Sequence, residues 1–147
     1  MFIAEAKSVT HELMDAFERL LPQLKSSFTP PLQTDMEALV LSDSSTLLYA
    51  RYPDVMGDVA GILALIIYRV PTGIRARIED VVVDEALRGK GIGEALTQYA
   101  LNMACEAGAD GVALTSNPKR KAANRLYKKM GFKPWRTNLY FYKFRKT

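Results

Sequence analysis

The sequence has one cysteine, one histidine and one tryptophan among 147 residues. The single cysteine, Cys105, excludes an internal disulfide and a cysteine-rich metal site, and one histidine, His11, adds too little to assemble any metal site. The longest apolar run, residues 59–68, is too short to span a bilayer, so we expect no membrane partner. Glu5 and Glu12 stand where a signal peptide would be basic and then apolar, so we expect a cytoplasmic protein.

The overall composition is that of a globular protein. Hydrophobic residues make up 48% and charged residues 24% of the chain, and the length suits one domain over residues 1–147. The net charge of +4 is modest, and because no nucleic-acid-binding motif accompanies it, we expect no nucleic acid partner. Basic residues gather over residues 119–129 and 143–146, which suits either a phosphate-facing surface or a solvated helix face.

Hydrophobic spacing predicts strands and helices in a mixed order. Apolar or alternating runs predict strands over residues 2–6, 46–52, 59–70, 74–83, 111–115 and 136–144. Helical spacing predicts helices over residues 9–24, with an interruption near Pro22, and over residues 34–41, 92–107 and 119–130. This order predicts an α+β (mixed α/β) fold, with a mostly antiparallel sheet, flanking helices and one parallel crossover.

The segment Arg-Gly-Lys-Gly-Ile-Gly at residues 88–93 joins a predicted strand to a predicted helix. The first turn of a helix has N–H groups without intrahelical partners and a partial positive charge, so it favours an anion. Glycines can adopt positive φ and let phosphate approach the backbone, while arginine and lysine add charge. We therefore assign pyrophosphate binding to Arg88, Gly89, Lys90, Gly91, Ile92, Gly93 and Glu94.

Two common phosphate motifs fit this segment poorly. A Walker A loop requires Ser or Thr after Gly-Lys, and none is present here. A dinucleotide fingerprint requires Gly or Ala at position 94, which is Glu94, although Ala95 leaves a relaxed form open. The segment instead resembles the acetyl-CoA pyrophosphate motif of the GNAT N-acetyltransferase superfamily, (Arg/Gln)-x-x-Gly-x-(Gly/Ala), at Arg88, Gly91 and Gly93.

A second stretch, residues 117–132, resembles the later motif of the same superfamily, with an Asn, a helix Tyr and a Gly-Phe ending. The resemblance covers residues 74–132 and implies the GNAT fold, with the sheet splayed at the acetyl-CoA site. It also implies N-acetyl transfer with acetyl-CoA as co-substrate and no metal. The backbone of Val81, Val82 and Val83 is then expected to contact pantetheine and to polarise the thioester carbonyl.

The resemblance also implies roles for three polar side chains in residues 117–132. Asn117 and Asn124 would contact the pantetheine arm, and Tyr127 would protonate the departing thiolate. Each has a structural alternative. Asn117 with Pro118 makes a helix-entry turn, and Tyr127 shares an apolar helical stripe with Leu126.

The attacking amine must lose a proton before it reacts, and Glu79 is the first candidate for the base. Simple alternation places it with Val81 and Val83, and places the second candidate, Asp80, on the other face. A β-bulge at this point would change that assignment. The structural alternative for Glu79 is an ion pair with Arg75 or Arg77.

The acceptor is harder to infer, because the early and late segments carry the least pattern. We expect a primary amine of a small molecule. A protein or peptide acceptor and a non-catalytic acyl-CoA-binding module remain open alternatives. A homodimer, paired through the last apolar strand over residues 136–144, also remains open.

Overall fold

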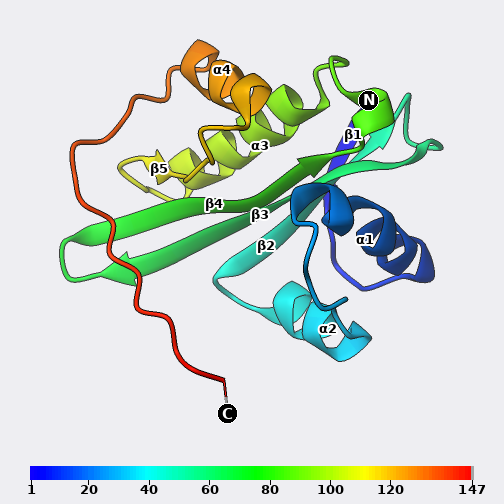
Figure 1. The fold of residues 1–147 in the computed structure, drawn as a ribbon, viewed down its shortest axis with the longest axis horizontal. Coiled ribbons are helices and arrows are strands. Elements are labelled where there is room, and N and C mark those ends of the chain that lie inside the picture. The colour runs from blue at the N-terminus through cyan, green and yellow to red at the C-terminus, as the bar shows by residue number, and fades with distance from the viewer. Residues whose placement is uncertain (147) are drawn as a thin grey trace. The chain divides into compact units, whose positions relative to one another are not determined.

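Alternating and continuous apolar runs over residues 45–83 form the three long strands at the centre of the sheet in the computed structural model (Figure 1). They are β2 (Ser45–Tyr52), β3 (Asp58–Val70) and β4 (Gly73–Val83), and they pair antiparallel in this order. The structure describes residues 1–146. The chain forms two compact units, residues 1–115 and a second unit that begins at residue 116 and is described as far as residue 146.

Two short strands complete the sheet of the first unit. β1 (Phe2–Glu5) pairs antiparallel with β2, and β5 (Val112–Ala113) pairs parallel with β4, so the strand order is β1-β2-β3-β4-β5. The predicted mixed α/β fold, with an antiparallel front half and one parallel crossover, is confirmed. The predicted strand over residues 111–115 is shorter than expected, because only Val112 and Ala113 pair with β4.

The predicted helices of this unit are present as α1 (His11–Leu24), α2 (Gln33–Leu41) and α3 (Ile92–Glu106). α1 begins after Thr10, whose Oγ1 accepts a hydrogen bond from the Leu13 N–H at 3.2 Å, as an N-cap does. The expected interruption at Pro22 is wrong. The helix reaches Leu24, and Lys25 N–H still donates to Leu21 O at 3.0 Å. No helix within residues 1–146 combines the length and apolar character needed to cross a bilayer.

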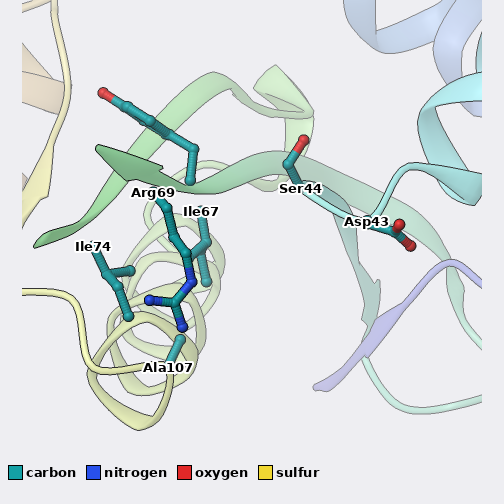
Figure 2. Close-up of a pocket in the computed structure, with 7 residues that line it drawn as sticks. Asp43, Ser44, Ile67, Arg69, Ile74 and Ala107 are labelled. Atoms are coloured by element: carbon teal, nitrogen blue, oxygen red, sulfur yellow. The ribbon is translucent and has the colours of Figure 1, made fainter. Parts of the chain in front are cut away.

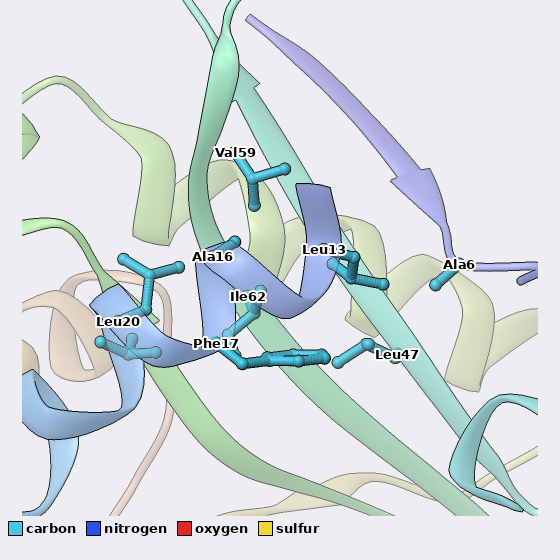
Figure 3. Close-up of a cluster of buried hydrophobic side chains, with 9 residues drawn as sticks. Ala6, Leu13, Ala16, Phe17, Leu20, Leu47, Val59 and Ile62 are labelled. Atoms are coloured by element: carbon cyan, nitrogen blue, oxygen red, sulfur yellow. The ribbon is translucent and has the colours of Figure 1, made fainter. Parts of the chain in front are cut away.

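The hydrophobic face of α1 packs on one face of the sheet (Figure 3). Leu13, Phe17 and Leu20 lie one helical turn apart and are all buried. The strands contribute Leu47 from β2, Val59 and Ile62 from β3, and Val82 from β4. Two alanines, Ala6 and Ala16, complete the cluster. The covered strand positions lie close to the end of β4, so α1 fixes that end of the strand.

α3 packs on the opposite face. A Cβ added to Gly61 would lie 3.2 Å from Leu96 Cδ1 and 3.3 Å from Ile92 Cγ2, so the β3 backbone approaches this helix closely. Gly61 neighbours Ile62, which belongs to the α1 cluster, and successive strand residues point to opposite faces. The start of α3 is therefore held against the sheet by buried side chains.

The second unit contains α4 (Lys121–Lys129), in agreement with the predicted helix over residues 119–130. The predicted strand over residues 136–144 is wrong, because these residues form no strand in the structure. Their aromatic side chains are exposed, as is Trp135 at 85%. A strand requires a partner for its backbone N–H and C=O groups, and the described part of this unit contains no other strand.

We predict that the α1 core is a main source of stability. Leu20 is 0% exposed and Leu41 is 79% exposed, so the two leucines form a matched pair. Leu20→Ala should lower the free energy of unfolding by about 2–5 kcal/mol, and Leu41→Ala by less than about 0.5 kcal/mol. Denaturant unfolding of both variants measures this, and equal losses would contradict the assignment of the core.

Candidate active site

β4 contains a bulge at the predicted base. Ala64 pairs with Glu79 and Ile62 pairs with Val82, so Asp80 and Val81 together oppose the single residue Leu63. Asp80 has a φ of 49°, the left-handed region that a non-glycine residue seldom adopts. The bulge therefore bends the strand and places a strained carboxylate-bearing residue on it.

The bulge reverses the faces that simple alternation predicts. Glu79 pairs with Ala64, which lies on the same face of β3 as Ile62, and Ile62 pairs with Val82. Glu79 thus shares the α1 face with Val82. The prediction that it shares a face with Val81 and Val83 is wrong, and the bulge that would change it is present.

Glu79 forms the predicted ion pair with Arg77, through a short contact between Arg77 Nε and Glu79 Oε1. Arg75, the other candidate partner, donates instead from Nη2 to Thr72 Oγ1 at 3.0 Å. The Glu79 side chain remains 43% exposed, so it is accessible from solvent despite the pair. The ion pair that was the structural alternative for Glu79 is therefore present. The carboxylate is still exposed enough to contact a substrate.

β4 also presents an open edge on its β5 side. The parallel pairing with β5 involves only Ala76 and Arg77 of β4, and no pairing with β5 continues along residues 78–83. These residues include the bulge and Val82 and Val83. An open strand edge can pair with the amides of an extended ligand as with another strand. This is where the sheet was predicted to splay.

The glycine loop has the predicted backbone geometry at two positions. Gly89 has a φ of 78° and Gly91 a φ of 79°, and no atom lies within 4 Å of a Cβ added to either. Gly93, by contrast, lies in α3 and does not use the positive φ that is open to glycine. Arg88 and Lys90 are exposed beside the two turns. The loop thus offers open backbone with cations at its rim.

The start of α3 has no side-chain cap. Gly91 is the N-cap residue, and the first helical hydrogen bond runs from Ala95 N–H to Gly91 O at 3.0 Å. The N–H groups of Ile92 and Gly93 precede this bond and have no helical acceptor. Backbone donors and the helix dipole therefore favour a bound anion at this point.

A short 3₁₀ turn, η1 (Glu85–Leu87), separates β4 from the loop and was not predicted. Asp84 caps it, because Asp84 Oδ1 accepts from Ala86 N–H at 3.1 Å. The signal was present in the sequence, since Asp followed by Glu-Ala-Leu is a helix-start pattern.

In the second unit, the two predicted asparagines lie together and bond to local backbone. Asn117 Oδ1 accepts from Lys119 N–H at 2.9 Å, which is the predicted helix-entry turn. Asn124 Nδ2 donates to Asn117 O at 2.9 Å and to Arg120 O at 2.8 Å. These bonds order the start of α4 and fix the orientation of both amides.

Tyr127 lies near the end of α4, where the Gly-Phe ending has a structural reason. Gly131 has a φ of 95°, Phe132 N–H donates to Tyr127 O at 3.0 Å, and Gly131 N–H donates to Lys128 O at 3.1 Å. This is a Schellman motif, and its hydrophobic contact is the edge-on packing of Phe132 and Tyr127, with ring centroids 5.6 Å apart. Burial raises the pKa of the Tyr127 phenol, and the nearby Arg120 partly opposes this rise.

A shallow cavity of about 470 Å³ lies at the far end of β3 (Figure 2). Its lining includes Asp43, Arg69, Ile74 and Ala107. Ala107 follows the end of α3, and 15 residues of helix, roughly 22 Å, separate it from the glycine loop. None of the predicted site residues lines this cavity, so it is not the candidate active site. Within residues 1–146 no cluster of His, Cys, Asp and Glu could hold a metal ion.

Comparison with known proteins gives a family match over most of the chain. Residues 7–132 match the sequence model of the acetyltransferase (GNAT) family. No curated protein matches the chain.

Solved structures share its fold at low sequence identity. A putative acetyltransferase from Agrobacterium tumefaciens str. C58 superposes with a TM-score of 0.79 at 21% identity, over 97% of this chain and 100% of that one. An aminoglycoside acetyltransferase from an uncultured soil metagenomic sample gives 0.78 at 17%, over 99% and 96%. A ribosomal-protein-alanine N-acetyltransferase from Brucella melitensis biovar Abortus 2308 gives 0.75 at 22%, over 98% and 100%.

We predict that the Tyr127 phenol ionises at a higher pH than the phenol of an ordinary tyrosine. Burial disfavours the phenolate, so the folded protein holds this proton above the usual pKa of 10.0. The stability that the neutral phenol contributes is complete below about pH 10 and is lost as pH rises through the raised pKa. Phenolate absorbance of the wild type minus that of Tyr127→Phe isolates this group among seven tyrosines. A difference curve with its midpoint at or below pH 10 would contradict the prediction.

Proposed function

The chain belongs to the GNAT acetyltransferase family, and from this we propose that it transfers the acetyl group of acetyl-CoA directly to a primary amine of a small molecule. The observation that carries the proposal is the uncapped start of α3 behind two positive-φ glycines, Gly89 and Gly91. A diphosphate there would accept hydrogen bonds from backbone amides and gain from the helix dipole.

The donor would lie along β4, with its diphosphate at residues 88–94. Pantetheine would pair with the open edge formed by Val81, Val82 and Val83, which supports amide-to-amide hydrogen bonds. Val81 has no one-to-one partner on β3, so its bulged backbone supplies a donor for the thioester carbonyl. Arg88 and Lys90 would add charge beside the phosphates.

The acceptor amine is protonated at neutral pH and must first lose a proton. We propose Glu79 as the base, because its side chain is partly exposed at the bulge. Asp80 is the second candidate, since strained φ values occur disproportionately at active sites. Both carboxylates would also attract a cationic acceptor.

In the proposed reaction the neutral amine attacks the thioester carbonyl carbon, the C–N bond forms and the C–S bond breaks. The CoA thiolate leaves and takes a proton from the Tyr127 phenol, which is protonated at neutral pH, as an ordinary tyrosine is. The attacking nitrogen loses its second proton to solvent as the C–S bond breaks, and the Tyr127 phenolate recovers a proton from solvent. The base then releases the proton it took, so the reaction releases one proton overall. The products are the N-acetylated amine and CoA. In the same scheme the oriented amides of Asn117 and Asn124 would contact the pantetheine arm.

A protein or peptide acceptor is the second candidate. Similar folds occur both in an aminoglycoside acetyltransferase and in a ribosomal-protein-alanine acetyltransferase, so the fold serves either kind of acceptor. CoA release with a panel of small amines and with peptides separates the two. Release with peptides alone would overturn the small-molecule proposal, and binding of acetyl-CoA without any release would favour a non-catalytic module.

We predict large losses of turnover when the proposed proton-transfer groups are replaced. Tyr127→Phe and Glu79→Gln should each lower kcat by about 10²-fold or more, because each removes one proton transfer. Asp80→Asn should have the smaller effect of the two carboxylate variants. CoA release at saturating substrates measures this.

Matched controls are available in α3. Tyr99→Phe and Glu106→Gln make the same chemical changes at exposed positions and should keep wild-type turnover. Unchanged turnover in Tyr127→Phe would remove Tyr127 as the acid. A larger loss in Asp80→Asn than in Glu79→Gln would transfer the role of base to Asp80.

A further inference from the structure

We propose that Arg19 and Gln23 of α1 are positioning residues for the donor site, because they fix the segment that leads from β4 into the glycine loop. This inference rests on the proposed function. Arg19 Nη1 forms a short ion pair with Asp84 Oδ2, and Arg19 Nη2 donates to Val59 O at 2.6 Å. One guanidinium thus joins α1 to β3 and to the residue that follows β4.

Gln23, one turn further along α1, adds a second attachment. Its Oε1 accepts a hydrogen bond from Glu85 N–H at 2.8 Å, and its Nε2 donates to Arg19 O at 3.1 Å. The amide is therefore held by its own helix while it bonds the first residue of η1. Two neighbouring side chains of α1 contact two consecutive residues, Asp84 and Glu85.

Asp84 itself is fixed from three directions. Its N–H donates to Ala60 O at 2.8 Å, its Oδ1 caps η1, and its Oδ2 contacts Arg19. A carboxylate that caps a turn with one oxygen and pairs with a cation through the other cannot rotate without losing one of these partners. The orientation of η1 therefore depends on the Arg19 contact.

Only Arg88 lies between η1 and the positive-φ turn at Gly89. The far side of the loop is held by burial of Ile92 and Leu96 in α3, whereas on the near side Val82 is the last buried residue and none of residues 83–91 is buried. The loop residues themselves, from Arg88 to Gly91, are exposed. The contacts from α1 are thus the near-side anchor of the proposed diphosphate site, and misplacement of this site would weaken donor binding.

A positioning role differs from a structural one in what it changes. The Arg19 side chain is 42% exposed, and a partly exposed ion pair contributes little to stability. Arg19→Gln should therefore lower Tm by no more than about 3 °C. It should raise the Kd and KM for acetyl-CoA about tenfold. This is less than the ~10²-fold loss of rate that a misplacement of about 1 Å can cause. Gln23→Ala should shift both constants in the same direction by less, and kcat at saturating acetyl-CoA should change less than KM.

Glu12→Gln is the matched control. Glu12 also lies on α1 and pairs with an arginine, Arg51, at 2.5 and 2.6 Å, but that pair joins the start of α1 to β2. The control variant should keep the wild-type Kd for acetyl-CoA. Equal Kd values for Arg19→Gln and the wild type would overturn the inference, and so would an equal rise in Glu12→Gln. If Arg19→Gln fails to fold, Gln23→Ala decides by the same criteria.

Hydrogen exchange of the ligand-free protein separates this inference from the proposed function. Backbone amides of residues 85–91 should exchange faster in Arg19→Gln than in the wild type or Glu12→Gln. Faster exchange without any acetyl-CoA binding by the wild type would remove the proposed function and show the anchor to be purely structural. Wild-type binding with unchanged exchange and Kd in Arg19→Gln would remove this inference alone.

Discussion

The arrangement of the candidate site depends on one backbone constraint, the pair of positive-φ turns at Gly89 and Gly91 between β4 and α3. These turns let the chain leave a strand and begin a helix without a capping side chain, so the first amides of α3 point outward. Burial of Ile92 and Leu96 fixes the helix side of the junction. The strand side is fixed by the α1 core and by contacts to Asp84. The two glycines, which are conformationally free by themselves, are therefore held in one conformation.

The bulge in β4 is the second determinant of the site. It shifts the register against β3 by one residue and brings Glu79 to the α1 face, while Asp80 takes a left-handed φ. The same strand lacks a β5 partner along residues 78–83. A bent strand with an open edge thus offers backbone groups and carboxylates within a few residues of the glycine loop. Acetyl transfer to an amine requires both an anchored thioester and a group that accepts a proton.

Local patterns in the sequence predicted local structure well. The glycine loop, α3 and the Gly-Phe ending of α4 follow from residue spacing and from glycine's access to positive φ. Both of these depend only on residues that are close together in the sequence. Properties that depend on distant partners were not readable. The face of Glu79 depends on register with β3, and the Arg19–Asp84 contact joins residues 65 positions apart. The aromatic, apolar residues 136–144 suggested a strand, but such a run supplies no pairing partner, and none is present in the described part of that unit.

The most direct test of the account is a calorimetric titration of the full chain with acetyl-CoA and, separately, with acetyl-pantetheine, which has the same thioester arm but no diphosphate. The account predicts that acetyl-CoA binds and that acetyl-pantetheine binds at least tenfold more weakly, because it cannot use the amides at the start of α3. Absence of acetyl-CoA binding, or equal affinity for the two compounds, would contradict the central claim that the glycine loop binds the diphosphate.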